Sequence, residues 1–312
     1  MADDIAKPPA EPDGTWSDRV TDAVLRAMIW TMRRLPWAMR VRAMGWMTRT
    51  VIGRLAGYRR RAEQNLAYVW PEMGPAERRR IAARACDNAG RTLIENYSHE
   101  ELAQRVRDLD PQGPGLAAIE EARKAGRPIL LVTGHIGNHE VPRHVLAARG
   151  IEVGGLYKAM RNPFFNSHYV QTLEQVSGPV FERGRRGTMG FTRHLKAGGA
   201  LVLLFDVFDH QGELIDFLGK PAPTSFSAAD LALRFDALLV PFFGIRGEDG
   251  LSFDVHFEAP VPHGDRRAMM RELTDRLEAR ILEHPEQWFW IHRRWKPGIV
   301  ARKWGAEAVA DM

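Results

Sequence analysis

The sequence has few of the features that mark secreted, zinc-stabilised or membrane-spanning proteins. Its 312 residues include one cysteine, Cys86, which cannot form an internal disulfide or a zinc ribbon and which fits a reducing compartment. No run of about 18 uncharged apolar residues occurs, so we expect no standard transmembrane helix. Residues 1–18 are acidic, contain proline and glycine and lack an apolar stretch. They predict a disordered leader and not a secretory signal.

Acidic residues are almost missing from the segment that follows. Between Arg19 and Arg61 there are eleven arginines and one acid, Asp22, so this segment carries +10 while the whole chain carries +5. Three tryptophans are interleaved with the arginines, and Pro36 is expected to divide the segment into two helices. The basic excess of the chain therefore lies in one helical region.

Three interpretations fit this basic region. Arginine and tryptophan on amphipathic helices are typical of a membrane interface with anionic lipid. An ordinary helix pair with a solvated basic face has the same composition, and a nucleic-acid patch is the third possibility. We favour docking on an anionic lipid surface and expect no nucleic-acid partner.

The rhythm of the sequence changes near residue 110. Residues 19–110 are predicted to be helical and to form the membrane-associating region. A run of proline and glycine at 110–115 marks the boundary. Residues 111–300 then alternate between helical patterns and short apolar strands, and 301–312 form a tail. This pattern predicts an α/β fold with a central mixed, mostly parallel sheet flanked by helices, and an adjacent pair of late strands near 238–245 and 252–257.

The first predicted strand, Ile129–Val132, leads into a candidate catalytic turn. His135 follows the strand, and Glu140 starts the next helix. Ligands of open α/β sheets bind beyond the carboxyl ends of the strands, so this pair could act as a general base with its orienting carboxylate. The alternative is a surface histidine and a helix-start glutamate that never meet. His139, Glu140 and His144 also approach a zinc-protease motif, but the second histidine comes one residue too late, and we expect no metal.

Further polar residues follow the other strands. Tyr157, Lys158 and Arg161 come after the second strand, where the two cations suit a phosphorylated or carboxylated substrate, although a solvated loop explains them equally well. Asp206 ends the third strand and is expected to bind substrate or to cap a loop. Residues 217–224 predict an apolar loop. The basic, aromatic run 292–296 predicts a solvated face or a surface that attracts phosphate.

Five blocks together resemble one protein family. The segment VTGHIGNHE, residues 132–140, resembles the His-x4-Glu block of the bacterial lipid A biosynthesis (lauroyl/myristoyl) acyltransferases, which are related to the His-x4-Asp glycerolipid acyltransferases. The other four blocks agree with the family in order and spacing: NLAYVWPE at 65–72, YKAMRNP at 157–163, Asp206 with FLGKPAPT at 217–224, and EQWFWIHRRWK at 286–296. Three positions depart from the family pattern, and they bear on substrate detail more than on chemistry: His139, Val207 and Leu218.

The resemblance implies a glycerolipid-acyltransferase-like fold and an O-acyltransferase. The acyl donor would be acyl carrier protein, or coenzyme A in some relatives, and the acceptor a hydroxyl of a lipid A precursor at the cytoplasmic face of the inner membrane. No cofactor besides the donor is implied. His135 would be the base, Glu140 its partner, and the backbone N–H groups of Gly137 and Asn138 the oxyanion donors. The residues expected to bind substrate are Asn138, Tyr157, Lys158, Arg161 and Asp206. Another glycolipid or aminolipid acceptor, or a non-catalytic membrane-surface protein, are the alternatives.

Overall fold

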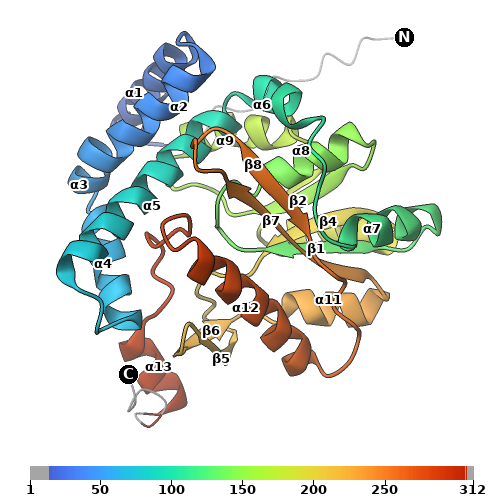
Figure 1. Ribbon diagram of the computed structural model, residues 1–312. Helices are drawn as coiled ribbons and strands as arrows, with labels where there is room; N and C mark the ends of the chain where they lie inside the picture. Colours follow the sequence, from blue (N-terminus) through green and yellow to red (C-terminus); the bar gives the residue numbers. More distant parts are fainter. Residues whose placement is uncertain (1–13, 306, 308–312) are drawn as a thin grey trace, which may run out of the picture.

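A six-stranded sheet forms the centre of the computed structural model, which describes residues 14–305 and 307 (Figure 1). The strand order is β3-β2-β4-β1-β7-β8, and every neighbouring pair is parallel except β7–β8. The strands are β1 (Ile129–Thr133), β2 (Val153–Tyr157), β3 (Val180–Glu182), β4 (Ala200–Leu204), β7 (Leu238–Arg246) and β8 (Phe253–Phe257). The predicted mixed, mostly parallel α/β fold is confirmed, including the late antiparallel pair.

Strand β1 lies between β4 and β7 and is buried along its whole length. Its aliphatic residues need no polar face, because helices cover both sides of the parallel part of the sheet. The register pairs Thr133 of β1 with Leu204 of β4. A residue two positions after Thr133 therefore lies beside the residue two positions after Leu204, at the carboxyl edge of the sheet. This register brings the candidate catalytic groups together.

The N-terminal helices lie beside the sheet (Figure 1) and contribute to the hydrophobic clusters on both of its faces. They are α1 (Trp16–Arg33), α2 (Trp37–Met47), η1 (Thr48–Ile52, a π-helix), α3 (Gly53–Leu55), α4 (Tyr58–Val69), α5 (Pro75–Asn96) and α6 (His99–Val106). The predicted break at Pro36 is confirmed. Hydrophobic clusters cross residue 110: Leu66 packs in one cluster with Leu130, and Met44 in another with Leu131. The division into regions at 110 stays a prediction.

The remaining helices alternate with the strands in the sequence or come after the last strand. They are α7 (Gly115–Lys124), α8 (Val141–Ala148), α9 (Pro163–Glu174), α10 (Arg185–Lys196), α11 (Ser227–Phe235), α12 (Arg266–Glu283) and α13 (Pro297–Trp304). Among the residues that the structure describes, no helix has both the length and the apolar character that crossing a bilayer requires.

Several predicted segments differ from the structure. Residues 217–224, predicted as an apolar loop, belong mostly to the hairpin of β5 (Glu213–Phe217) and β6 (Lys220–Thr224), whose turn uses positive φ at Leu218 and Gly219. Part of the predicted leader, residues 14–18, includes the capped start of α1, and the predicted tail includes the end of α13. Residues 1–13 of the leader and 306 and 308–312 of the tail lie outside the described residues.

Candidate active site

His135 and Asp206 meet at the carboxyl edge of the sheet. Each lies two positions beyond the paired residues Thr133 and Leu204, so the parallel register sets them side by side. The Nδ1 atom of His135 lies 2.7 Å from Oδ1 of Asp206, and the backbone N–H of His135 donates to Oδ2 of the same carboxylate at 2.7 Å. Asp206 thus fixes both the ring and the backbone of His135.

Asp206 is fully buried, and both of its carboxylate oxygens accept hydrogen bonds. In addition to the two from His135, it accepts one from Nε1 of Trp288 at 2.8 Å. Burial alone would raise the pKa of the Asp206 carboxyl, but the nearby charge of His135 and the hydrogen bonds from it outweigh burial and hold the pKa below its usual value. The carboxylate is therefore ionised at neutral pH, and Nδ1 of His135 must be the donor in their hydrogen bond.

The block at 286–296 closes over His135 from the other side. The carbonyl oxygen of His135 accepts a hydrogen bond from the backbone N–H of Phe289 at 2.9 Å. The ring of His292 lies edge-on to that of His135, with 4.6 Å between centroids. Burial first, and the neighbouring His135 second, lower the pKa of His292 to about 3, so this second imidazole is neutral at physiological pH. The His135 side chain itself is 28% exposed and can reach a substrate.

A buried network holds the turn that follows His135. Gly137 has a φ of +57°, and a Cβ at this position would lie 2.0 Å from the carbonyl oxygen of Gly244, so only glycine fits. The Gly137 carbonyl accepts hydrogen bonds from Asn88 and Thr92 of α5. Arg246 of β7 pairs with Glu95 of α5 in the same buried layer. The N-terminal helices therefore help to position the turn.

The expected contact between Glu140 and His135 is wrong. No hydrogen bond or ion pair joins them among the residues that the structure describes, because Asp206 already occupies Nδ1 of His135. Glu140 instead pairs with the buried Arg143 and lies 3.5 Å from Nε2 of His139. Glu140 is the N-cap residue of α8. Its position one turn before Arg143 explains the pairing, since residues three apart share a helix face.

The expected oxyanion donors are also wrong in this conformation. The backbone N–H of Gly137 donates to the carbonyl of Gln287 at 3.2 Å, and that of Asn138 donates to the carbonyl of Gly244 at 2.9 Å. Asn138 is fully buried, and its side-chain amide donates to Glu95. All of these groups are engaged within the fold, and Asn138 has no exposed surface in the structure.

A cavity of about 950 Å³ opens beside His135. Its apolar wall comes from the sheet and from α10 and α11, and includes Leu156, Phe191, Leu203, Phe205, Ala228 and Leu231. Tyr157 and Lys158 line it as well, and so do Glu140, Arg143 and His139. Arg161 is exposed and lies outside the lining, so of the two predicted cations only Lys158 faces this cavity. Asp206 lies behind His135 and is not part of the lining.

Trp288 and His292 are the site residues that sequence reasoning did not assign. The run 292–296, which contains His292, was predicted as a solvated face or a surface that attracts phosphate, yet Arg294 within it is fully buried and donates to the carbonyls of Val207 and Pro223. Trp288 and Trp290, just before this run, are fully buried as well. The density of tryptophan was the available signal, because large aromatic side chains seldom remain on a solvated face. Among the residues that the structure describes, no group of three or more His, Cys, Asp or Glu side chains could hold a metal ion.

Comparison with known proteins gives one consistent family. The model of the bacterial lipid A biosynthesis acyltransferases matches residues 16–297. The chain is 26% identical over 252 residues to lipid A biosynthesis acyltransferase 2 of Shigella flexneri, covering 77% of this chain and 78% of that protein. It is 24% identical to the lipid A biosynthesis lauroyltransferase of Escherichia coli K12, covering 75% and 77%. It is also 24% identical to a phosphatidylinositol mannoside acyltransferase of Mycobacterium tuberculosis H37Rv, covering 65% and 64%.

Proposed function

This chain belongs to the bacterial lipid A biosynthesis acyltransferase family, and on that premise we propose that it transfers a fatty acyl chain from acyl carrier protein to a hydroxyl of a lipid A precursor at the cytoplasmic face of the inner membrane. The observation that carries this proposal is the imidazole of His135, held by the buried Asp206 at the wall of a large, partly apolar cavity. A coenzyme A thioester would serve the same chemistry as donor.

His135 acts as the general base in this reaction. Because Nδ1 donates to Asp206, Nε2 carries the free lone pair. It takes the proton of the acceptor hydroxyl as the hydroxyl oxygen attacks the thioester carbonyl. The new C–O ester bond forms and the C–S bond breaks, and the proton passes from His135 to the departing thiolate. Asp206 stabilises the imidazolium between these steps. The residues of the chain supply the proton transfers, so the proposed reaction uses no cofactor besides the acyl donor.

The lining of the cavity includes both apolar and cationic side chains, which suit the two ends of such substrates. The apolar wall along β2, β4, α10 and α11 would hold the acyl chain. Lys158, Arg183, Arg293 and Lys296 line the same cavity. Burial first, and then the charges of Arg293 and Lys158, lower the pKa of Lys296, so both of these cations act on Lys296. Such a cluster favours the phosphates of a glycolipid acceptor or of the donor's phosphopantetheine arm.

Glu140 has a supporting role in this proposal. Its pairing with Arg143 ties the start of α8 to the carbonyls of Val153 and Ser177, to which Arg143 donates at 2.8 Å each. The carboxylate thus keeps the wall of the cavity next to His135 in shape, and it accompanies His139, which faces His135 with 5.5 Å between ring centroids.

The N-terminal helices would dock the enzyme on the membrane surface. Eight of the large apolar side chains that are exposed in the structure lie between Trp16 and Leu55, and arginines are interleaved with them. Apolar side chains that enter the headgroup boundary, together with cations that meet anionic lipid, are the two forces that hold an interfacial helix. The enzyme would therefore work where its lipid acceptor is found.

A second acceptor class follows from one of the relatives. The mycobacterial relative is named for transfer to a phosphatidylinositol mannoside, which is a different glycolipid. Its similarity to this chain over 206 residues favours a phosphorylated glycolipid acceptor of that kind as the alternative to a lipid A precursor.

The test is an assay of the purified chain with acyl carrier protein thioesters of graded length and a lipid A precursor, beside a phosphatidylinositol mannoside. We expect the acylated precursor to form with the wild-type chain and not with a His135→Ala variant. Turnover that survives in His135→Ala would contradict the role of the base. If the chain acylates only the mannoside, the proposed lipid A acceptor is wrong, but the proposed acyl transfer with His135 as the base still holds.

A further inference from the structure

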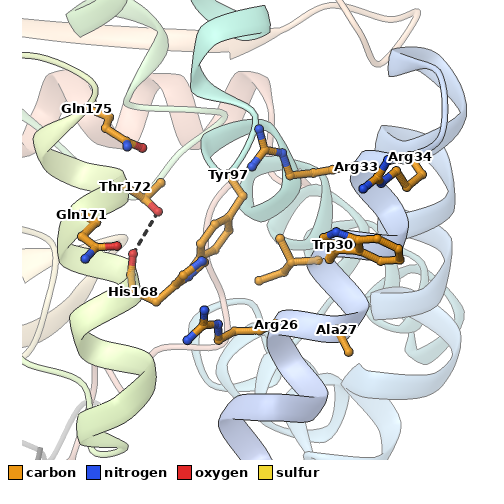
Figure 2. Close-up of a pocket in the computed structure, with 11 residues that line it drawn as sticks. Arg26, Ala27, Trp30, Arg33, Arg34, Tyr97, His168, Gln171, Thr172 and Gln175 are labelled. Atoms are coloured by element: carbon orange, nitrogen blue, oxygen red, sulfur yellow. Dashed lines mark hydrogen bonds between the residues drawn. The ribbon is translucent and has the colours of Figure 1, made fainter. Parts of the chain in front are cut away.

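A second cavity lies between α1 and α9, away from His135. Its volume is about 760 Å³, and Figure 2 shows its lining. Helix α1 with its C-cap residue contributes three arginines, α9 with its C-cap residue contributes hydroxyl, amide and imidazole groups, and Tyr97 comes from the end of α5. The full lining is Arg26, Ala27, Ile29, Trp30, Arg33, Arg34, Tyr97, His168, Gln171, Thr172 and Gln175. It contains three permanent cations and no carboxylate.

The charges in this α1–α9 cavity are poorly compensated. Figure 2 shows Arg26 and Arg33 pointing from α1 toward α9. Among the described residues, the guanidinium of Arg33 makes no ion pair or hydrogen bond. Arg26 pairs only with Asp22, with 3.8 Å between Nη1 of the arginine and Oδ2 of the aspartate. Arg34 lies at the side of the cavity, with its guanidinium 4.4 Å from the ring centroid of Trp30. Two guanidinium groups that face one space with so little counter-charge indicate an anionic ligand.

Buried polar atoms in the same wall also lack partners. Tyr97 is 4% exposed, yet its hydroxyl has no hydrogen-bond partner among the described residues. It stacks on His168, with 5.2 Å between ring centroids, and Nδ1 of His168 is likewise buried without a partner. An unpaired buried hydroxyl costs free energy unless a ligand or water pairs with it. This observation is independent of the arginines and points to a hydrogen-bonding ligand in the cavity.

The surface of α1 beside the cavity is apolar and exposed. An α-helix turns by about 100° per residue, so Trp16, Val20, Val24 and Trp30 fall on one face of α1. Their exposed fractions are 79%, 40%, 62% and 60%. Arg26 and Arg33, seven residues apart, lie in a row between this face and the face buried against the protein. The arrangement places an anion-binding pocket at the edge of an apolar stripe, which matches a molecule with a charged head and hydrocarbon tails.

We propose that the α1–α9 cavity binds the headgroup phosphate of one anionic phospholipid molecule, with Arg26 and Arg33 as its ligands and its acyl chains lying along the exposed stripe of α1. This inference rests on the membrane docking in the proposed function, but not on acyl transfer. Helix α9 also supplies Tyr169 and Leu173 to the cavity at His135, so the lipid would brace a helix that both cavities share.

The test is vesicle binding by the full chain, without acyl donor or acceptor, so that a failure here is separate from a failure of catalysis. Arg26→Lys/Arg33→Lys keeps the net charge but loses the planar, two-pronged donors. We expect it to weaken binding to phosphatidylcholine vesicles that contain phosphatidylglycerol by about tenfold. The matched control, Arg54→Lys/Arg60→Lys, changes two exposed arginines outside the cavity and is expected to bind like the wild type. Equal affinity of both variants would mean diffuse electrostatics and would overturn the site.

A neutral substitution gives a second measurement. Tyr97→Phe removes the unpaired hydroxyl and no charge, and we expect it to weaken the same vesicle binding about threefold while leaving the Tm at or above the wild-type value. An unchanged affinity would remove Tyr97 from the site. Inorganic phosphate and soluble glycerol 3-phosphate distinguish the source of the anion. If either one binds tightly to the wild type without vesicles, and if this binding is lost in Arg26→Lys/Arg33→Lys, the cavity binds a free anion and the lipid proposal is overturned.

Discussion

His135 donates through Nδ1 to Oδ1 of Asp206 over 2.7 Å, although 71 residues separate them in the sequence. Two adjacent parallel strands bring them together, because β1 and β4 end in register. The same carboxylate binds the backbone of His135 and the indole of Trp288. The imidazole is therefore oriented by the ends of two paired strands and by Trp288, and not by the turn that follows it.

Asp206→Asn is expected to lower the rate of acyl transfer by about 10²–10⁴-fold. An amide cannot stabilise the imidazolium by charge, and its NH₂ group would favour the wrong tautomer of His135. The measurement is the transfer rate at saturating donor and acceptor, with the Tm recorded to exclude unfolding. Asp216→Asn, on an exposed carboxylate of β5, is the matched control. A near wild-type rate in Asp206→Asn would rule out the role that we give this carboxylate.

Glu140→Gln is expected to act first on stability. It breaks the buried ion pair with Arg143 and leaves the guanidinium without its counter-charge, which costs about 3–5 kcal/mol in the free energy of unfolding. Denaturant unfolding measures this loss. Glu152→Gln, at an exposed position before β2, serves as the control. A Glu140→Gln protein with wild-type stability but no turnover would instead assign Glu140 directly to the chemistry.

The sequence predicted the elements of the fold better than the partners within the site. Apolar runs and glycine stops located β1, β4 and the β7–β8 pair, because burial dictates those patterns locally. The pairing of His135 with Asp206 depends on which strands are neighbours, and β4 inserts between β1 and β2. Strand order is a property of the whole chain, so nearness in sequence wrongly favoured Glu140. Similarly, Arg294 and Trp295 of the run at 292–296 are buried by tertiary packing, which the basic charge of the run did not indicate.

Ala228→Leu is expected to shorten the acyl chain that the enzyme prefers. Ala228 lies on α11 in the apolar wall of the cavity at His135, so a larger side chain there takes up space meant for methylene groups. Each methylene that no longer fits should cost about tenfold or more in kcat/KM. Competition between acyl carrier protein thioesters of graded length measures the shift. Ala232→Leu, on the same helix but not in the cavity lining, tests whether packing strain alone explains the effect. An unchanged length preference in Ala228→Leu would show that the chain lies elsewhere.

Acid is expected to destabilise the protein through its buried histidines. Burial is the main reason that the pKa of His144 is lowered from 6.5 to about 4, with Glu140 opposing it. The unfolded chain therefore holds a proton on this histidine between pH 6.5 and pH 4, whereas the folded chain does not. Because the unfolded state binds more protons in this window, stability falls as the pH falls, by about 1.4 kcal/mol per pH unit for each such group. His139 and His292 add to the effect, since burial lowers their pKa values to about 4 and about 3.

His144→Gln separates this contribution from the rest, because His144 lies on α8 outside the lining of the cavity at His135. Glutamine has no proton to gain, so the free energy of unfolding of this variant should depend less steeply on pH between 6.5 and 4. Urea unfolding across that range measures the slope. His210→Gln, at an exposed position, should leave the slope as in the wild type. If the slopes of His144→Gln and the wild type coincide, the acid sensitivity comes from other groups. Asp206 is not one of them in this range, because the stability that its lowered pKa provides is lost only as the pH falls below its ordinary pKa of 3.8.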